Sequence, residues 1–271
     1  MPELPEVEVT KTGLMPLLQE RTVKRVNVYN ANLRFKITED LKNVENHRIT
    51  GLYRRAKYII VSTDGGGSFV IHLGMTGHLK VIQVSQPLVK HDHYEMILDN
   101  GMSLRYNDPR RFGAIVWTSG DPLELPFLSR LGVEPLTDDL NPVYLLKELR
   151  KRKTNLKQTL MNNEIVVGIG NIYASEILFS CNISPCRRAD SVTENECELL
   201  VEQIKLTLQS SIEQGGTTIR DFSQVDGKPG YFVQKLKVYG KSGEPCPCCG
   251  SEIIHIVQGQ RSTYYCPNCQ K

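Results

Sequence analysis

The sequence of 271 residues lacks an apolar run of the length that a membrane-spanning helix needs, about 18 residues. It also lacks an initial basic segment followed by a short apolar one, the pattern of a secretory signal. We therefore expect a soluble, cytoplasmic protein without a membrane partner. The net charge of +3 is too small to indicate a nucleic-acid partner by itself. No internal repeat or low-complexity segment is present.

The distribution of the eight cysteines is not that of a secreted disulfide protein, because five of them fall in the last 26 residues. Two pairs, Cys246-x2-Cys249 and Cys266-x2-Cys269, are separated by 16 residues. This spacing predicts one tetrahedral zinc ion per chain, held by four thiolates and structural because no coordination position stays open. Cys248 is not expected to bind the zinc ion, although a ligand set that includes it is an alternative. The remaining three are expected to be reduced: Cys181, Cys186 and Cys197.

Short apolar or alternating segments, divided by turn signals such as Asp64-Gly65-Gly66-Gly67, fill residues 22–120. An amphipathic run over 5–19 predicts a helix before them. Seven strands at this spacing predict an antiparallel sandwich or barrel. The expected strands are Thr22–Val28, Tyr58–Ser62, Ser68–His72, Leu79–Val84, Tyr94–Leu98, Ser103–Tyr106 and Ala114–Trp117.

After Pro142 the apolar residues repeat with the period of a helix. Helices are expected at 143–152, 154–162, 171–180, 192–214 and 217–222. Toward the end, Ile253–Val257 and Ser262–Tyr265 flank a turn and predict a hairpin between the cysteine pairs. The sequence thus predicts an α+β fold, with an N-terminal helix and antiparallel β-sandwich followed by a helical domain and a zinc-ribbon β-hairpin. Three domains are expected, at 1–134, 135–231 and 232–271, because the segment 121–142 has the composition of a linker.

The second residue is the first candidate for chemistry. If Met1 is removed, Pro2 presents a secondary amine whose pKa is near that of an α-amino group, roughly 7.7–8.0. A useful fraction is neutral at physiological pH and can attack an aldehyde-like sugar carbon. The positive end of the following helix lowers this pKa further, and Glu3 is placed to transfer a proton. Taken alone, the alternative is that Pro2 is an ordinary start and Glu3 an ordinary helix carboxylate.

Two other segments indicate phosphate binding. The segment from Lys147 to Lys157 holds six basic residues and one acidic residue, Glu148. Such a segment is either a solvated helix face or a phosphate-binding surface. Gly168-Ile169-Gly170-Asn171 precedes a helix expected to begin at Ile172, with Asn171 as its N-cap. Such a glycine pair is a weak signal that more often reflects close packing.

Taken together, these blocks resemble the bacterial formamidopyrimidine-DNA glycosylase family, which removes 8-oxoguanine. The similarity spans nearly the whole chain, in the family's order and spacing. The blocks begin with Met1-Pro2-Glu3-Leu4-Pro5-Glu6-Val7-Glu8 and end with the cysteine-rich hairpin. Between them lie Arg54-Arg55-Ala56-Lys57-Tyr58, His72-Leu73-Gly74-Met75-Thr76-Gly77, Lys90-His91-Asp92-His93, Asp108-Pro109-Arg110-Arg111-Phe112-Gly113 and Gly168-Ile169-Gly170-Asn171-Ile172-Tyr173.

The resemblance implies a bifunctional glycosylase and apurinic/apyrimidinic lyase that acts as a monomer on damaged double-stranded DNA. Pro2 and Glu3 are then catalytic, Lys57 assists β-elimination, and Arg261 on the hairpin stabilises the leaving phosphate in δ-elimination. The basic segment and the glycine pair become a helix–two-turns–helix motif. In it, Lys157, Asn171 and Arg152 contact the DNA backbone, and the loop 223–231 covers the extruded base.

The resemblance also implies that three residues fill the hole left by the extruded base: Met75, Arg110 and Phe112. An apolar side chain and an aromatic ring support the opened stack, while Arg110 binds the orphaned cytosine. His91 and His93 could in principle bind a metal ion, but a phosphate contact by His91 is preferred, since no carboxylate pattern accompanies them.

Two alternatives remain. The endonuclease VIII branch prefers oxidised pyrimidines, but its members typically have glycine where this chain has Leu4. A zinc-ribbon DNA-binding protein without catalysis is the other, against which Pro2, Glu3 and Lys57 argue.

Overall fold

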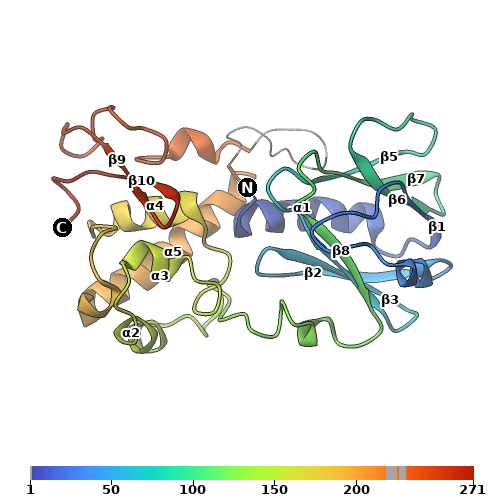
Figure 1. Cartoon of the computed structure of the whole chain (residues 1–271), viewed down its shortest axis with the longest axis horizontal. Helices are drawn as coiled ribbons and strands as arrows, with labels where there is room; N and C mark the ends of the chain where they lie inside the picture. The colour runs from blue at the N-terminus through green and yellow to red at the C-terminus, as the bar shows by residue number, and fades with distance from the viewer. Residues whose placement is uncertain (1, 218–224, 226–229) are drawn as a thin grey trace. The chain divides into compact units, whose positions relative to one another are not determined.

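A computed structural model of the chain describes residues 2–217, 225 and 230–271 (Figure 1). The chain forms two compact units, each made of two segments. The sheet unit comprises Met1–Ser129 with Gly215–Tyr231, and the helical unit comprises Arg130–Gln214 with Phe232–Lys271. The division predicted from the sequence, at 1–134, 135–231 and 232–271, stays a prediction.

The sheet unit is an antiparallel sandwich with one long helix, α1 (Leu4–Leu18). One sheet has the order β1-β6-β7-β5 and the other β2-β3-β4-β8. Apolar side chains from both sheets and from α1 form a single core, which includes Leu14, Met96 and Phe69. The predicted sandwich is therefore confirmed. The strands are β1 (Val23–Val28), β2 (Ile49–Arg55), β3 (Tyr58–Thr63), β4 (Ser68–His72), β5 (His78–Gln83), β6 (Asp92–Leu98), β7 (Met102–Asn107) and β8 (Ala114–Thr118).

All seven expected strands are present, with ends that differ by at most two residues. The strand that the sequence did not predict is β2. Its alternation is broken, because the pairing with β3 shifts register between Ile49 and Gly51, and only Ile49 and Leu52 are buried. A bulge moves the following residues to the other face, so a strict period of two cannot detect such a strand.

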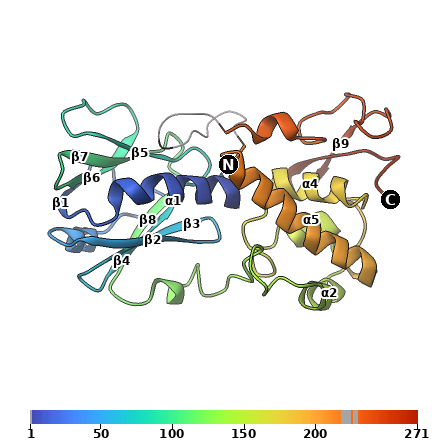
Figure 2. The ribbon, with the colours of Figure 1, turned by 180° about the vertical axis from the view of Figure 1, so that it is seen from behind.

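The helical unit contains α2 (Pro142–Arg150), α3 (Leu156–Leu160), α4 (Asn171–Ser180) and α5 (Glu194–Glu213). Asparagine side chains cap the first two, since Asn141 accepts from Tyr144 N and Asn155 from Gln158 N, both at 2.9 Å. A capping box of Thr193 and Glu196 starts α5. Figure 2 shows α4 and α5 beside each other. Short 3-10 helices lie at Glu39–Val44, Pro122–Glu124, Ala189–Ser191 and Phe232–Lys235.

Helix α4 has the bounds expected from the apolar period, 171–180, but its N-cap is Gly170 rather than Asn171. The prediction of Asn171 as the cap was wrong, because its side-chain oxygen accepts a bond from Lys157 instead. The helix is central to its unit, as every residue from Ile172 to Phe179 is buried. The short helix expected at 217–222 falls, apart from Thr217, outside the described residues.

The predicted hairpin is present as β9 (Ile254–Gln258) and β10 (Arg261–Tyr265). A buried carboxylate on α4 holds the segment that leads to it: Glu176 accepts from the backbone N–H groups of Lys237, Val238 and Tyr239 at 2.8–3.0 Å. Of the helices that the structure describes, none is both long and apolar enough to cross a membrane.

We expect Glu176→Gln to destabilise the helical unit by about 1–3 kcal/mol, because the amide nitrogen cannot accept from a backbone N–H and leaves a buried donor unpaired. Urea denaturation followed by far-UV circular dichroism measures this loss. The one tryptophan, Trp117, lies in β8 and reports on the sheet unit. Glu198→Gln, on the exposed face of α5, is the control and should leave the transition unchanged. An unshifted Glu176→Gln curve contradicts the assignment.

Candidate functional site

Two glutamates, Glu3 and Glu6, form hydrogen bonds at the start of α1. Pro2 and Glu3 are both buried, and Glu3 caps the helix. The Glu3 amide donates to Glu6 Oε2 at 2.8 Å, and Glu6 Oε1 accepts from the amide of Thr217 at the same distance. Glu6 thus joins the beginning of the helix to a segment 211 residues away in sequence. Pro2 and Glu3 stand at the positive end of the helix dipole, where a protonated amine is disfavoured.

Lys57 lies in the turn between β2 and β3, which Ala56 enters with a φ of +53°. Its side chain is largely buried, at 9% exposure. Its positive charge acts on His72 at the end of β4, whose pKa is lowered to about 4 by burial first, then by Arg34 and Lys57. His72 is therefore neutral at physiological pH, and its Nδ1 accepts from the Gly74 amide at 3.0 Å. The sequence did not single out this histidine, because a lone His at the end of a buried strand carries no spacing signal.

Met75, Arg110 and Phe112 come from two loops that lie against each other. A Cβ on Gly74 would approach the amide nitrogen of Gly113 to 2.5 Å. The Arg110 guanidinium carbon lies 4.7 Å from the centre of the Phe112 ring, a cation–π arrangement. Phe112 is 47% exposed. The structure therefore places the three predicted wedge residues near one another, with an arginine and an aromatic ring at the surface.

The two histidines of 90–93 differ in their surroundings. His91 lies one residue before β6 and has a φ of +73°, while His93 is buried with its Nε2 2.8 Å from the carbonyl oxygen of Asp108. Among the residues that the structure describes, no cluster of possible metal ligands includes either ring. The predicted phosphate contact of His91 stays a prediction.

In the helical unit, Lys157 is almost completely buried, at 1% exposure. Its ammonium group donates to Asn171 Oδ1 at 2.6 Å, to the Ser262 carbonyl at 2.9 Å and to Thr263 Oγ1 at 2.7 Å. Asn171 in turn donates to the Ser262 carbonyl at 2.9 Å and to the Tyr239 hydroxyl at 3.4 Å. Two predicted DNA-binding residues thus lie side by side, and both are anchored on β10.

Arg261 lies beside the same cluster. It is exposed at the start of β10, directly after a tight turn in which Gly259 and Gln260 have φ values of +53° and +61°. A small cavity of about 150 Å³ is lined by both Arg261 and Lys157. Arg152 is half-buried, and its Nε is a buried donor without a hydrogen-bond partner among the described residues.

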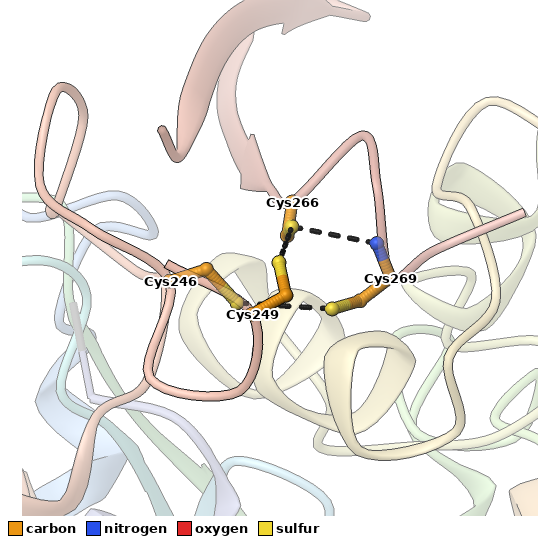
Figure 3. Close-up of side chains that lie close together, drawn as sticks. All are labelled: Cys246, Cys249, Cys266 and Cys269. Carbon is orange, nitrogen blue, oxygen red and sulfur yellow. Dashed lines mark hydrogen bonds between the residues drawn. The ribbon is translucent and has the colours of Figure 1, made fainter. Parts of the chain in front are cut away.

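The four predicted zinc ligands lie together (Figure 3). All four Sγ atoms of Cys246, Cys249, Cys266 and Cys269 are within 4.8 Å of one another. The distance from Cys246 to Cys269 is 3.9 Å and that from Cys249 to Cys266 is 3.5 Å. A tetrahedron with Zn–S bonds of about 2.3 Å has sulfur atoms roughly 3.8 Å apart, so the geometry fits zinc. Cys248 is exposed and outside the cluster.

Three family models match successive parts of the chain. They are the formamidopyrimidine-DNA glycosylase N-terminal domain over residues 1–115, the H2TH domain of the same enzyme over 131–223, and a zinc finger found in FPG and IleRS over 243–271. The last match agrees with the cysteine geometry, and the four cysteines form one structural zinc site.

Full-length relatives agree with these models. The chain is 50% identical to formamidopyrimidine-DNA glycosylase of Vibrio atlanticus over 270 residues and 48% identical to that of Pasteurella multocida over 271, with complete coverage of both chains in each comparison. A Lactococcus lactis FPG mutant in complex with Fapy-dG-containing DNA matches with a TM-score of 0.93 at 33% identity, over 100% of both chains. The Thermus thermophilus MutM (FPG) structure matches with 0.90 at 35% identity, over 99% of this chain and 98% of the other. The chain belongs to the formamidopyrimidine-DNA glycosylase family.

Proposed function

We propose that the protein is a DNA glycosylase of base excision repair that removes oxidised purines, namely 8-oxoguanine and formamidopyrimidines, and then cleaves the strand as a lyase. The observation that carries this proposal is the match over the full chain to a relative solved on Fapy-dG-containing DNA, with Pro2 and Glu3 held at the start of α1. It acts as a monomer on damaged duplex DNA, in the bacterial cytosol at the nucleoid.

The chemistry starts at Pro2 once Met1 has been removed. The amine nitrogen forms a bond to C1′ of the damaged nucleotide, and the N-glycosidic bond breaks as the base leaves with a proton from Glu3. The C1′–O4′ bond of the sugar ring then breaks as O4′ takes up the proton that the amine nitrogen gives up, which leaves an iminium between nitrogen and C1′ that acidifies the C2′ proton. β-Elimination then breaks the bond from C3′ to its phosphate oxygen, and δ-elimination breaks the bond at C5′.

Lys57 supports the first elimination by contacting the phosphate or sugar. Arg261 supports the second as a fixed positive charge beside the leaving phosphate, since its pKa above 12 makes proton donation unfavourable. His91, Arg152, Lys157 and Asn171 serve binding of the DNA backbone. Met75 and Phe112 fill the stack while Arg110 hydrogen-bonds the orphaned base. The loop 223–231, which covers the extruded purine in this proposal, lies outside the described residues except for Val225, Gly230 and Tyr231.

Zinc fixes the hairpin that carries Arg261. The thiolates of Cys246 and Cys266 are buried in a small core with Ile253, Val238 and Phe179, so the ion and the apolar contacts together define the fold of this part. The endonuclease VIII branch is disfavoured by Leu4, and a purely DNA-binding role by the retained Pro2 and Glu3.

The nucleophile is tested by borohydride, which reduces the iminium and attaches the protein to DNA covalently. Pro2→Gly keeps an amine but loses the ring, and we expect lyase activity to fall sharply while lesion binding persists. Glu3→Gln should bind DNA but excise slowly, because the proton donor is lost. An uncleaved N-terminal extension should abolish trapping, and its removal by a protease should restore it. Trapping by the extended protein would show that another amine is the nucleophile.

Removal of one zinc ligand is the second test. Cys266→Ser should lower the zinc content below one ion per chain, unfold the hairpin and abolish DNA binding, because the site supplies folding free energy to a small segment. The Trp117 fluorescence of the sheet unit should stay native. Cys248→Ser, which alters an exposed cysteine outside the cluster, should behave as wild type. Full zinc content and normal binding in Cys266→Ser would refute the ligand set.

The third test concerns the base opposite 8-oxoguanine. Excision should be efficient opposite cytosine and weak opposite adenine, because Arg110 donates to acceptors that cytosine presents and adenine lacks. Such a match is worth about 1–3 kcal/mol, roughly ten- to a hundred-fold in rate or affinity. Arg110→Ala should lower the ratio of the excision rates opposite cytosine and adenine, when excision is measured opposite all four bases. Equal wild-type rates opposite cytosine and adenine would exclude Arg110 as the reader.

A further inference from the structure

One carboxylate lies behind the loops that carry Met75, Arg110 and Phe112. Asp108, directly after β7, has 0% exposure. Its Oδ1 accepts from the Thr76 hydroxyl at 2.6 Å and from the Arg110 amide at 3.3 Å. Its Oδ2 accepts from the Tyr106 hydroxyl at 3.1 Å and from the Gly113 amide at 2.9 Å. Four donors from two loops and a strand therefore meet at a single side chain.

The backbone of Asp108 is also engaged. Its N–H donates to the His91 carbonyl at 3.1 Å, and its own carbonyl accepts from the Arg111 amide at 3.2 Å. His91 and Arg111 have φ values of +73° and +56°, a left-handed conformation that is uncommon outside glycine. Such conformations persist where the surrounding contacts over-determine them. Asp108 supplies contacts of this kind on both sides.

Glycines of both loops approach Tyr106, which is a partner of this carboxylate, closely. A Cβ on Gly113 would lie 1.7 Å from the Tyr106 hydroxyl oxygen, and one on Gly77 would lie 2.4 Å from it. Burial first, and then the Asp108 carboxylate, raise the pKa of Tyr106, so its hydroxyl stays protonated and donates. The loops are thus held by close backbone approach as well as by hydrogen bonds.

We propose that Asp108 is the positioning residue of the base-reading loops: it joins the Thr76 loop to the Arg110 loop and thereby sets the discrimination between bases opposite the lesion. Being buried, it acts through Arg110 and Met75 rather than on the DNA. Hydrogen-bond readout requires placement within about 0.5 Å, which an arginine on an unanchored loop does not achieve. The inference rests on the proposed function.

Asp108→Asn tests it with little change in shape. An amide nitrogen cannot accept from the Arg110 or the Gly113 N–H, so one loop loses its anchor. We expect the excision preference for cytosine over adenine to fall by about five-fold or more. In Asp108→Asn, the rate of excision opposite cytosine should fall by a larger factor than borohydride trapping on single-stranded abasic DNA, because the single strand has no opposite base. Amide hydrogen exchange, measured without DNA, should accelerate in 74–77 and 109–113.

Glu95→Gln is the matched control. Glu95 is a buried carboxylate of β6 that accepts from Asn27, Tyr29 and Arg105, none of which lies in the two loops. This variant should unfold at lower denaturant concentration but keep the base preference and the exchange rates of both loops. Thr76→Val, which removes one donor to Asp108, serves as a second variant and replaces Asp108→Asn if that protein does not fold.

An unchanged preference and unchanged loop exchange in folded Asp108→Asn, or in Thr76→Val where it replaces that variant, overturn the proposal. An equal loss of preference in Glu95→Gln does the same, since any destabilisation of the sheet unit would then suffice. Failure of the proposed function has a different signature, a wild-type protein that does not excise. Amide hydrogen exchange then still tests whether Asp108 joins the two loops, because it is measured without DNA. Faster exchange confined to these loops in Asp108→Asn supports that role.

Discussion

The ammonium group of Lys157 is the interaction on which the helical unit depends. A charge with 1% exposure is tolerated only when each of its donors is paired, and here the partners come from the start of α4 and from β10. The three bonds fix the hairpin on the helices, in addition to the bonds of Glu176. The hairpin that carries Arg261 is therefore anchored by a buried charge inside the unit, in addition to the four-cysteine site.

The same device recurs with carboxylates. Glu6, Asp108 and Glu176 are each buried, and each accepts a hydrogen bond from a segment distant in sequence: backbone N–H groups for Glu6 and Glu176, and the Thr76 hydroxyl for Asp108. A buried carboxylate is costly when unpaired and strongly bonded when its lone pairs are filled. Such side chains help to specify one arrangement of the segments that they join. Both units thus contain a buried carboxylate that joins segments distant in sequence.

Strands with regular alternation, the capped helices and the cysteine spacing could be predicted from the sequence because their signals are local. The register shift in β2 concealed that strand, and Asn171, expected as the cap of α4, instead accepts a hydrogen bond from Lys157. The burial of Lys157 itself was not predictable, since a lysine in a basic segment is normally exposed. His72 and Asp108 were missed as site residues because their importance lies in partners distant in sequence. The family resemblance supplied the candidate site, and contacts between distant segments had to come from the structure.

Each unit consists of two segments of the chain, which has a consequence for synthesis. The Glu6 side chain finds the Thr217 amide only after residues 130–214 have been translated. At about 5–20 residues per second, the roughly 85 intervening residues take on the order of 4–17 s. During that interval the residues of α1 and of both sheets have been synthesised, but the segment that bonds to Glu6 has not. The order of translation therefore makes the bond between Glu6 at the start of α1 and Thr217 a late event in folding.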